Sequence, residues 1–408
     1  MDTTRMTPSL VQLYLDRSKA SPLDVTLGVE TRDRSLQQLV DRASQVRQLS
    51  FTKMGWWKWK TIAKRFSVSP LPALSHLQFF AVIPANAAAP DSAIFPHAVN
   101  LRHLFIQSSG PSTPIWSHIS FPSLTSIRIE FEGKREPITM LGQLLGVLRS
   151  SPLLEDVHLG LRTLATEPGV SYRPVPLHRL RKLVLSCEPT PILLTSIIFP
   201  PTACVLARVT VVERRIHSPT FPLGQHLSPL ILGSDELIFS VSIMSMLSTV
   251  HFKKDGDTRV KFEYYGSSDP ATLDRTLTFA TACPLDAIRR FVIAGIRNCE
   301  ANDQISQTMR NLTSVKTLVL KDSRHSISLL CPEVQGGQLP FPALETLMID
   351  DNHDSTHKAL VRVAKGRAEA GYSLPRIISR TKYPEELAGE LRQFVGSVVH
   401  GEGVEFSS

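Results

Sequence analysis

The nine residues Phe121–Ile129, with the sequence FPSLTSIRI, decide the fold, and Phe341–Ile349 (FPALETLMI) repeats their pattern. At the end of the first stretch apolar and polar residues alternate, which predicts a short β-strand with two apolar side chains on one face. A leucine three residues earlier completes the pattern L-x-x-L-x-L, and we expect it to turn the chain into the strand. The proline after each phenylalanine favours an extended approach and ends any helix before it.

Similar apolar triplets recur along the chain, with steps of 23 to 30 residues between neighbouring first positions on either side of one longer gap. The triplets are Val46-Leu49-Phe51, Leu74-Leu77-Phe79, Leu101-Leu104-Ile106, Leu124-Ile127-Ile129, Leu154-Val157-Leu159, Leu180-Leu183-Leu185, Leu206-Val209-Val211, Ile288-Phe291-Ile293, Val315-Leu318-Leu320 and Leu344-Leu347-Ile349. Weaker pairs at Val25-Leu27, Leu237-Phe239 and Val260-Phe262 bring the count to about thirteen units. This triplet at a period of roughly 20–29 residues is typical of leucine-rich repeats.

Amphipathic helices are predicted between the strands, at Ser35–Ala43, Thr139–Arg149, Asp303–Asn311 and His357–Ala370. One strand with one helix cannot bury its apolar face alone, so neighbouring units must stack into a continuous core. The alternation of strands and helices predicts parallel strands and right-handed connections. We therefore expect an α/β leucine-rich-repeat solenoid, a curved horseshoe with its helices on the convex side. An ordinary two-domain α/β protein with coincidental spacing is the alternative.

Three regions are expected along the chain. Residues 1–45 form an N-terminal cap, residues 46–352 the solenoid, and residues 353–408 a helical C-terminal cap. The segment Met1–Leu15 lacks the apolar core of a secretory signal, and no apolar run reaches the roughly 20 residues of a membrane span. We expect an intracellular protein, cytoplasmic or nuclear, without membrane contact.

Charge and cysteine content narrow the classes of function. The formal charge is +8, from 45 basic and 37 acidic residues, which favours acidic partners, but no run of basic residues resembles a nucleic-acid-binding tail. The five cysteines (Cys187, Cys204, Cys283, Cys299 and Cys331) show no paired spacing, so we expect reduced and mostly buried thiols.

Sequence motifs for catalysis are missing. The chain contains no GxSxG, HExxH, P-loop or, after a predicted strand, GxGxxG pattern. The cluster Asp350–Asp354 (DDNHD) could attract a divalent cation, although a polar loop after a strand has the same composition. We expect no enzyme, no cofactor and no metal.

An aromatic and basic segment stands out at residues 53–65. It carries Trp56, Trp57, Lys58, Trp59 and Lys60. Alternating aromatic and basic residues can hold single-stranded nucleic acid or anchor a protein interface. The other interpretation, which we favour, is a helix over Trp57–Phe66 whose apolar residues pack in the core.

The strand positions between the apolar residues predict a binding surface, because their side chains point together away from the core. They are neutral and rich in aromatic and histidine residues in the first third, and basic further along. The residues that we predict to contact a partner are His76, Gln78, His103, Phe105, Arg128, His158, Lys182, Arg208, Arg259, Lys261 and Arg290. The hypothesis is that the basic stretch from Lys182 to Arg290 meets an acidic protein; the alternative is that these charges only keep the sheet soluble.

The opening of the chain, Thr7–Ser18 followed by Ala20–Leu27, resembles the segment after the F-box in the large F-box proteins of mushroom-forming fungi. The strands of the form FPxLxxLxL resemble the repeats of the same proteins. The resemblance implies protein binding, as the substrate receptor of a ubiquitin ligase. Two features depart from the family: no F-box precedes Thr7 in this sequence, and the asparagine that follows each strand in regular repeats is matched only by Asn352. A scaffold unconnected to ubiquitination, or a nucleic-acid binder through residues 53–65, are the other hypotheses.

Overall fold

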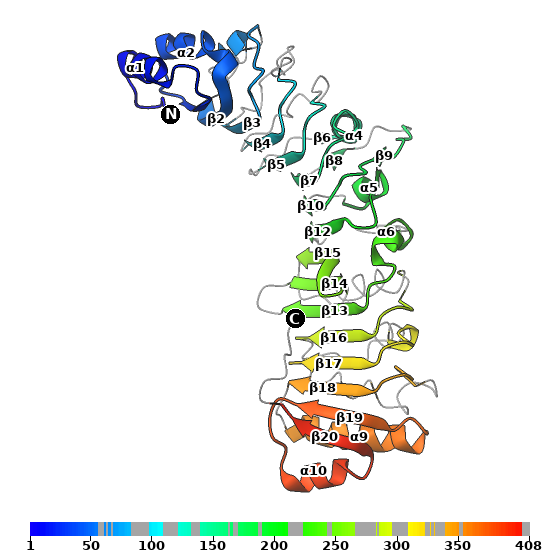
Figure 1. Cartoon of the computed structure of the whole chain (residues 1–408). Helices are drawn as coiled ribbons and strands as arrows, with labels where there is room; N and C mark the ends of the chain where they lie inside the picture. The colour runs from blue at the N-terminus through cyan, green and yellow to red at the C-terminus, as the bar shows by residue number, and fades with distance from the viewer. Residues whose placement is uncertain are drawn as a thin grey trace. The chain divides into compact units, whose positions relative to one another are not determined.

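The computed structural model describes residues 1–55, 61–62, 64–66, 68–82, 98–108, 121–131, 139–161, 164–165, 170–186, 190–210, 223–242, 247–265, 283, 285–295, 309–322, 327, 330, 339–350 and 354–401. These residues form an α/β protein with mostly parallel strands, which confirms the predicted class (Figure 1). The chain divides into two compact units, Met1–Ala203 and Cys204–Ser408, and each is described by itself.

The sheet of unit 1 is parallel throughout its described pairs, and its strands follow chain order. Across the sheet they are β1 (Leu23–Gly28), β2 (Val46–Gly55), β3 (His76–Val82), β4 (His103–Ser108), β5 (Ser126–Phe131), β7 (Asp156–Gly160) and β10 (Lys182–Ser186). Two short parallel pairs lie outside this sheet, β6 (Thr139–Met140) with β8 (Leu164–Ala165) and β9 (Val175–Pro176) with β11 (Ile197–Ile198). The predicted strand at Val25-Leu27 is confirmed as β1.

The inward side chains of these strands stack in rows that cross the sheet. Leu104 on β4 is in register with Ile127 on β5, which pairs through Val157 with Leu183 on β10. The side chains of this row are at most 4% exposed, so they share one apolar layer, as the triplets predict. Burial of the first triplet positions, such as Leu124, is confirmed as well.

A hydrogen-bonded turn precedes most strands and explains the proline of the FPxL pattern. The N–H of Leu124 donates to the carbonyl of Phe121 at 3.1 Å, and Leu344 donates to Phe341 at the same distance. Proline at the second position of such a turn supplies the φ angle that the turn needs. The predicted extended approach was therefore wrong: the proline starts a tight turn.

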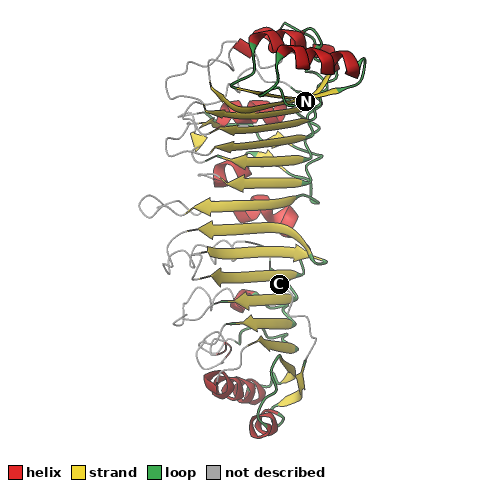
Figure 2. Ribbon diagram, turned by 90° about the vertical axis from the view of Figure 1, so that its left-hand side faces the viewer, coloured by secondary structure: helices red, strands yellow, loops and turns green. Residues whose placement is uncertain are grey.

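The helices of unit 1 lie at its first edge and on the inward side of its sheet. At the first edge α1 (Pro8–Ser18) packs against α2 (Asp33–Val40), which is followed by a short 3-10 turn, η1 (Ala43–Gln45). Further along, α4 (Leu141–Arg149) and α5 (Thr190–Thr195) lie behind the strands in Figure 2. The side of the strands opposite α4 and α5 faces the viewer in that figure.

The sheet of unit 2 does not follow chain order. Across this sheet the strands are β12 (Cys204–Thr210), β15 (Asp257–Tyr265), β14 (Leu247–Lys254), β13 (Glu236–Ser242), β16 (Arg290–Ala294), β17 (Thr317–Lys321), β18 (Thr346–Asp350), β19 (Leu374–Ser379) and β20 (Val395–His400). Strand β14 is antiparallel to both of its neighbours, whereas the other described pairs of this unit are parallel. One helix, α6 (Leu223–Ile231), precedes β13.

The structure corrects the predicted array at this place. Leu237-Phe239 and Val260-Phe262 do belong to strands, but these strands are joined by the antiparallel β14 instead of standing as successive parallel units. The triplet at Leu206 was also wrong: Val205 and Ala207 are buried on β12, while Leu206 is half-buried on the other face. Ala203 and Ala207 are too small to show as leucine-like positions in the sequence.

Unit 2 ends in two helices and two strands. Helix α9 (Asp354–Glu369) leads to β19, and α10 (Glu385–Leu391) leads to β20, so the region expected to be a helical cap also extends the sheet. Arg367 of α9 is completely buried and donates hydrogen bonds to the carbonyls of Pro340 and Phe341 at 2.8 and 3.0 Å. No helix within the described part of the chain has the length and apolar character that a membrane span requires.

Candidate interaction face

The outward side chains of unit 1 form two continuous rows, because parallel strands in register place equivalent positions side by side. The first row is Asp24, Gln48, His76, His103, Ser126, Asp156 and Lys182, and the second is Thr26, Ser50, Gln78, Phe105, Arg128, His158 and Val184. Seven predicted contact residues, His76, Gln78, His103, Phe105, Arg128, His158 and Lys182, are thus brought together on one surface, the unit 1 face.

Aromatic and histidine side chains meet at the centre of the unit 1 face. The rings of His76 and His103 stack with centroids 4.3 Å apart, and Phe80 meets Phe105 edge to face at 5.2 Å. The guanidinium carbon of Arg128 lies 5.2 Å from the centre of the Phe105 ring, within cation–π distance. We call these five residues the aromatic–histidine cluster; all are exposed or half-exposed.

Glu130 orients the cationic end of this cluster. Arg128 donates from Nε and Nη2 to Glu130 Oε1 at 2.9 and 2.7 Å, and His158 Nε2 lies 3.7 Å from the same oxygen. Burial lowers the pKa of His76, and the neighbouring His103 lowers it further. The His76 imidazole therefore favours the neutral form at neutral pH, in which its ring nitrogens both donate and accept hydrogen bonds.

The outward face of unit 2, the unit 2 face, carries the basic residues in a different arrangement. Arg208 Nε and Lys261 Nζ approach the carboxylate of Glu263 at 2.8 and 2.7 Å. Burial alone would raise the pKa of Glu263, but hydrogen bonds from Lys261 and Arg208 outweigh it and lower that pKa. Both cations of this group are therefore paired with a carboxylate, whereas the sequence shows only a basic stretch.

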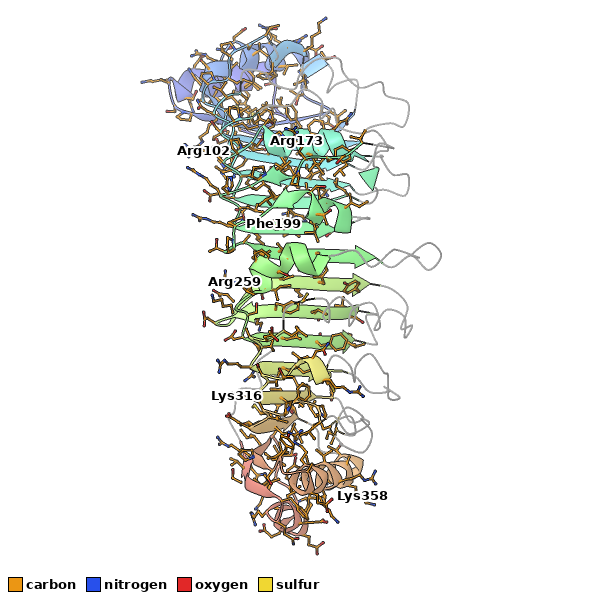
Figure 3. The ribbon with its side chains drawn as sticks, turned by 90° about the vertical axis from the view of Figure 1, so that its right-hand side faces the viewer. Arg102, Arg173, Phe199, Arg259, Lys316 and Lys358 are labelled. Carbon is orange, nitrogen blue, oxygen red and sulfur yellow. The ribbon has the colours of Figure 1, made fainter. Side chains whose placement is uncertain are left out.

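A second carboxylate of the unit 2 face is paired in the same way. Arg290 Nε and Lys253 Nζ lie 3.0 and 3.8 Å from Glu236. Arg259, also predicted to bind a partner, is half-buried near the start of β15, and Figure 3 places it with Lys316 along one edge of the strands. Of the basic residues predicted in unit 2, Arg208, Lys261 and Arg290 thus lie on one face.

His251 of β14 lies on the unit 2 face. Because its pKa is lowered in the folded state, we predict that the stability of the protein depends on pH. Burial, with help from Lys261 and Lys253, lowers its pKa to about 4. Because the unfolded histidine has a pKa near 6.5, the folded state resists protonation, and stability falls as the pH drops from about 6.5 to about 4. We expect a loss of about 2–3 kcal/mol attributable to this group.

Urea unfolding of the wild type and of His251→Gln at pH 7 and at acidic pH measures this term. The variant should lose less free energy of unfolding on acidification than the wild type. Equal losses in both proteins, or an NMR titration of His251 near pH 6.5, would contradict the prediction.

The other predicted sites have less support. Trp56, Trp57, Lys58, Trp59 and Lys60 lie outside the described residues, while Ile62 and Phe66 after them are buried, as the core interpretation predicts. Within the described ranges no group of three or more His, Cys, Asp or Glu side chains is placed to hold a metal ion. Among the described cysteines, Cys204 and Cys283 carry thiols, and burial raises the pKa of Cys283 to about 12.

Sequence reasoning missed several residues of the unit 2 face, namely Glu236, His251, Lys253 and Arg380, and it considered Asp350 only as part of a cation site. The first three belong to the β13–β14 hairpin, whose strand β14 was not predicted. No protein-family model matches the chain, and no curated protein matches it significantly.

Proposed function

We propose that this chain is a protein-recognition module of the leucine-rich-repeat type, whose unit 1 face binds a partner protein and catalyses no reaction. The single observation that carries the proposal is the aromatic–histidine cluster on the sheet face opposite α4 and α5. Aromatic and arginine side chains dominate the binding energy of protein interfaces. A sheet face with such a cluster offers shape and hydrogen bonding to a partner.

The repeat type is supported by two recurring features. In-register apolar rows run through the described strands of unit 1, and the same hydrogen-bonded turn precedes strands in both units. Both are what a stack of similar strand-containing units requires. The irregular step lengths and the antiparallel β14 make this an irregular member of the class.

We further propose that the chain acts as the substrate receptor of a ubiquitin ligase. This proposal rests on the resemblance of Thr7–Leu27 and of the FPxL strands to fungal F-box proteins. Expression of the gene together with its upstream coding sequence tests it. Co-purification of the ligase adaptor supports it, and an adaptor-free complex with the same partner favours a stand-alone scaffold.

Partner capture should depend on the aromatic–histidine cluster. The double variant Phe105→Ala/Arg128→Ala removes its central ring and the cation above it, so we expect partner affinity to fall about 30-fold, equivalent to roughly 2 kcal/mol. The measurement is quantitative affinity purification followed by titration of the identified partner. A photo-crosslinking residue at position 105 should mark the same partner directly.

The double variant Val170→Ala/Arg179→Ala is the matched control. Both residues are exposed in unit 1, and neither belongs to the rows of the unit 1 face. This variant should bind normally. If capture is equal in both double variants, or if crosslinks form only away from position 105, another surface binds the partner.

A further inference from the structure

Three rows of outward side chains cross the unit 2 face, and the middle row is apolar. From β13 to β19 this row consists of Ile238, Val292, Val319, Met348 and Ile378, each at most 6% exposed. The rows on either side carry charges. On one side these include Lys253, Glu236 and Arg290, and on the other Lys321 and Asp350, with Arg380 just past β19.

Charged side chains flank the apolar row on both sides. Lys321 lies on one side, yet Arg290, Glu236 and Lys253 on the other side all influence its pKa, which burial lowers most. A ligand that lies over the unit 2 face would meet charges on both sides of this buried row.

The charges of the unit 2 face follow one repeated arrangement, a carboxylate between two cations, which we call a charge triad. The first is Arg208–Glu263–Lys261 and the second Lys253–Glu236–Arg290. In the third, Arg380 Nη1 contacts both oxygens of Asp350 at 3.1 and 3.2 Å, and Lys321 is the register neighbour of Asp350. Each triad thus contains two cations and one carboxylate.

A hollow of about 590 Å³ opens beside the third triad, at the carboxyl ends of the strands. Its lining includes Lys321, Asp350 and Arg380 together with the small residues Ser240, Ala294 and Gly295. Ser240, Ala294 and Lys321 follow one another in the same row, so two short side chains stand next to a long one. The hollow therefore exists because residues 240, 294 and 295 are small.

We propose that the unit 2 face binds an extended acidic segment of a partner protein, with its carboxylates at the charge triads and one side chain in the hollow over Ala294. This inference rests on the proposed function of protein recognition and names a second contact with its chemistry. From β15 to β19 there are six strand steps of about 4.8 Å, or roughly 29 Å, which about nine extended residues would span.

A protein segment fits this face better than a nucleic acid does. Single-stranded nucleic acid is held by aromatic side chains that stack on its bases. The three rows between β13 and β19 contain no Phe, Tyr or Trp among the described positions. Every triad also includes a carboxylate, which can accept hydrogen bonds from peptide N–H groups.

Fluorescence anisotropy with the full chain tests the proposal. The probe is a labelled peptide of about twelve residues in which Glu and Ser alternate, roughly 40 Å when extended. The Gln/Ser peptide of equal length is the neutral control, and single-stranded oligothymidine represents nucleic acid. We expect the acidic peptide to bind, to bind more weakly as salt increases, and to bind more tightly than either control.

Variants with opposite charge changes make the test specific. Lys321→Met/Arg380→Met removes both cations of the third triad and should weaken peptide binding about tenfold, equivalent to about 1.4 kcal/mol. Asp350→Asn removes the carboxylate of the same triad and should strengthen binding, an effect that a folding defect would not produce. Ala294→Leu fills the hollow at a half-exposed position and should weaken binding.

Lys358→Met/Arg362→Met is the control for net charge, because it removes two exposed cations from α9, where Figure 3 shows Lys358. It should bind like the wild type. The proposal is overturned if the acidic and neutral peptides bind equally, if the triad and α9 variants behave alike, or if oligothymidine binds more tightly. Phe105→Ala/Arg128→Ala should not change peptide affinity, so failure here is distinguishable from failure of the unit 1 proposal.

Discussion

Replacement of Gly295 by alanine is expected to lower the free energy of unfolding by about 3 kcal/mol or more. Gly295 follows β16 with a φ angle of +74°, a conformation that costs an L-residue about 1–2 kcal/mol. In addition, a Cβ atom there would lie 2.0 Å from the carbonyl oxygen of Val241 on β13. Since this neighbour is backbone, the two strand ends would have to move apart.

Two other glycines separate backbone strain from steric overlap. Gly371 also has a positive φ, +83°, but a Cβ there meets nothing within 4 Å, so Gly371→Ala should cost only the strain. Gly389 lies within α10 in open space, and Gly389→Ala should raise stability by roughly 0.5–1 kcal/mol. Urea unfolding of the three variants gives the comparison. Equal losses at Gly295 and Gly371 would show that the two strand ends are free to separate.

Replacement of Arg367 by leucine should cost about 2–4 kcal/mol, although it exchanges a buried charge for an apolar side chain. The guanidinium donates to the carbonyls of Pro340 and Phe341, which begin the turn before β18. Phe341 has a φ of +50°, which is unfavourable for a phenylalanine, so its turn depends on outside support. Without Arg367 the carbonyl of Pro340 loses this donor, and the carbonyl of Phe341 keeps only the N–H of Leu344.

The exposed Arg362 of the same helix provides the control for this substitution. Arg362→Leu should leave the free energy of unfolding within about 0.5 kcal/mol of the wild type. Arg367→Lys keeps a charge but not the planar fork that reaches both carbonyls, so it should be destabilising too. If Arg367→Leu unfolds at the urea concentration of the wild type, the turn before β18 does not need this anchor.

Local sequence patterns were sufficient for most strands and for the composition of the unit 1 face. Alternation over two or three residues fixes which side chains share a face, since it depends only on the strand geometry of a few neighbours. For this reason His76, His103, Phe105 and Arg128 could be assigned to one surface. Their stacking and cation–π distances required the register between strands.

One missed element had a visible signal. Asp255-Gly256 joins β14 to β15, both residues have positive φ angles, and Lys254 pairs with Asp257, which defines a two-residue hairpin turn. An Asp-Gly pair between alternating strands predicts such a hairpin. The expectation of regular repeat spacing outweighed this signal, so the antiparallel strand was overlooked.

Residues close in the chain determine the strands, the turns before them and the division into inward and outward side chains. Which strands become neighbours was decided only by tertiary packing, because the order β15–β14–β13 is produced by strand pairing in space and not by spacing along the chain. Consequently Arg208 meets Glu263 and Arg290 meets Glu236 across more than fifty residues. Electrostatic pairing at such separation depends on distance in the folded state, which no local pattern specifies.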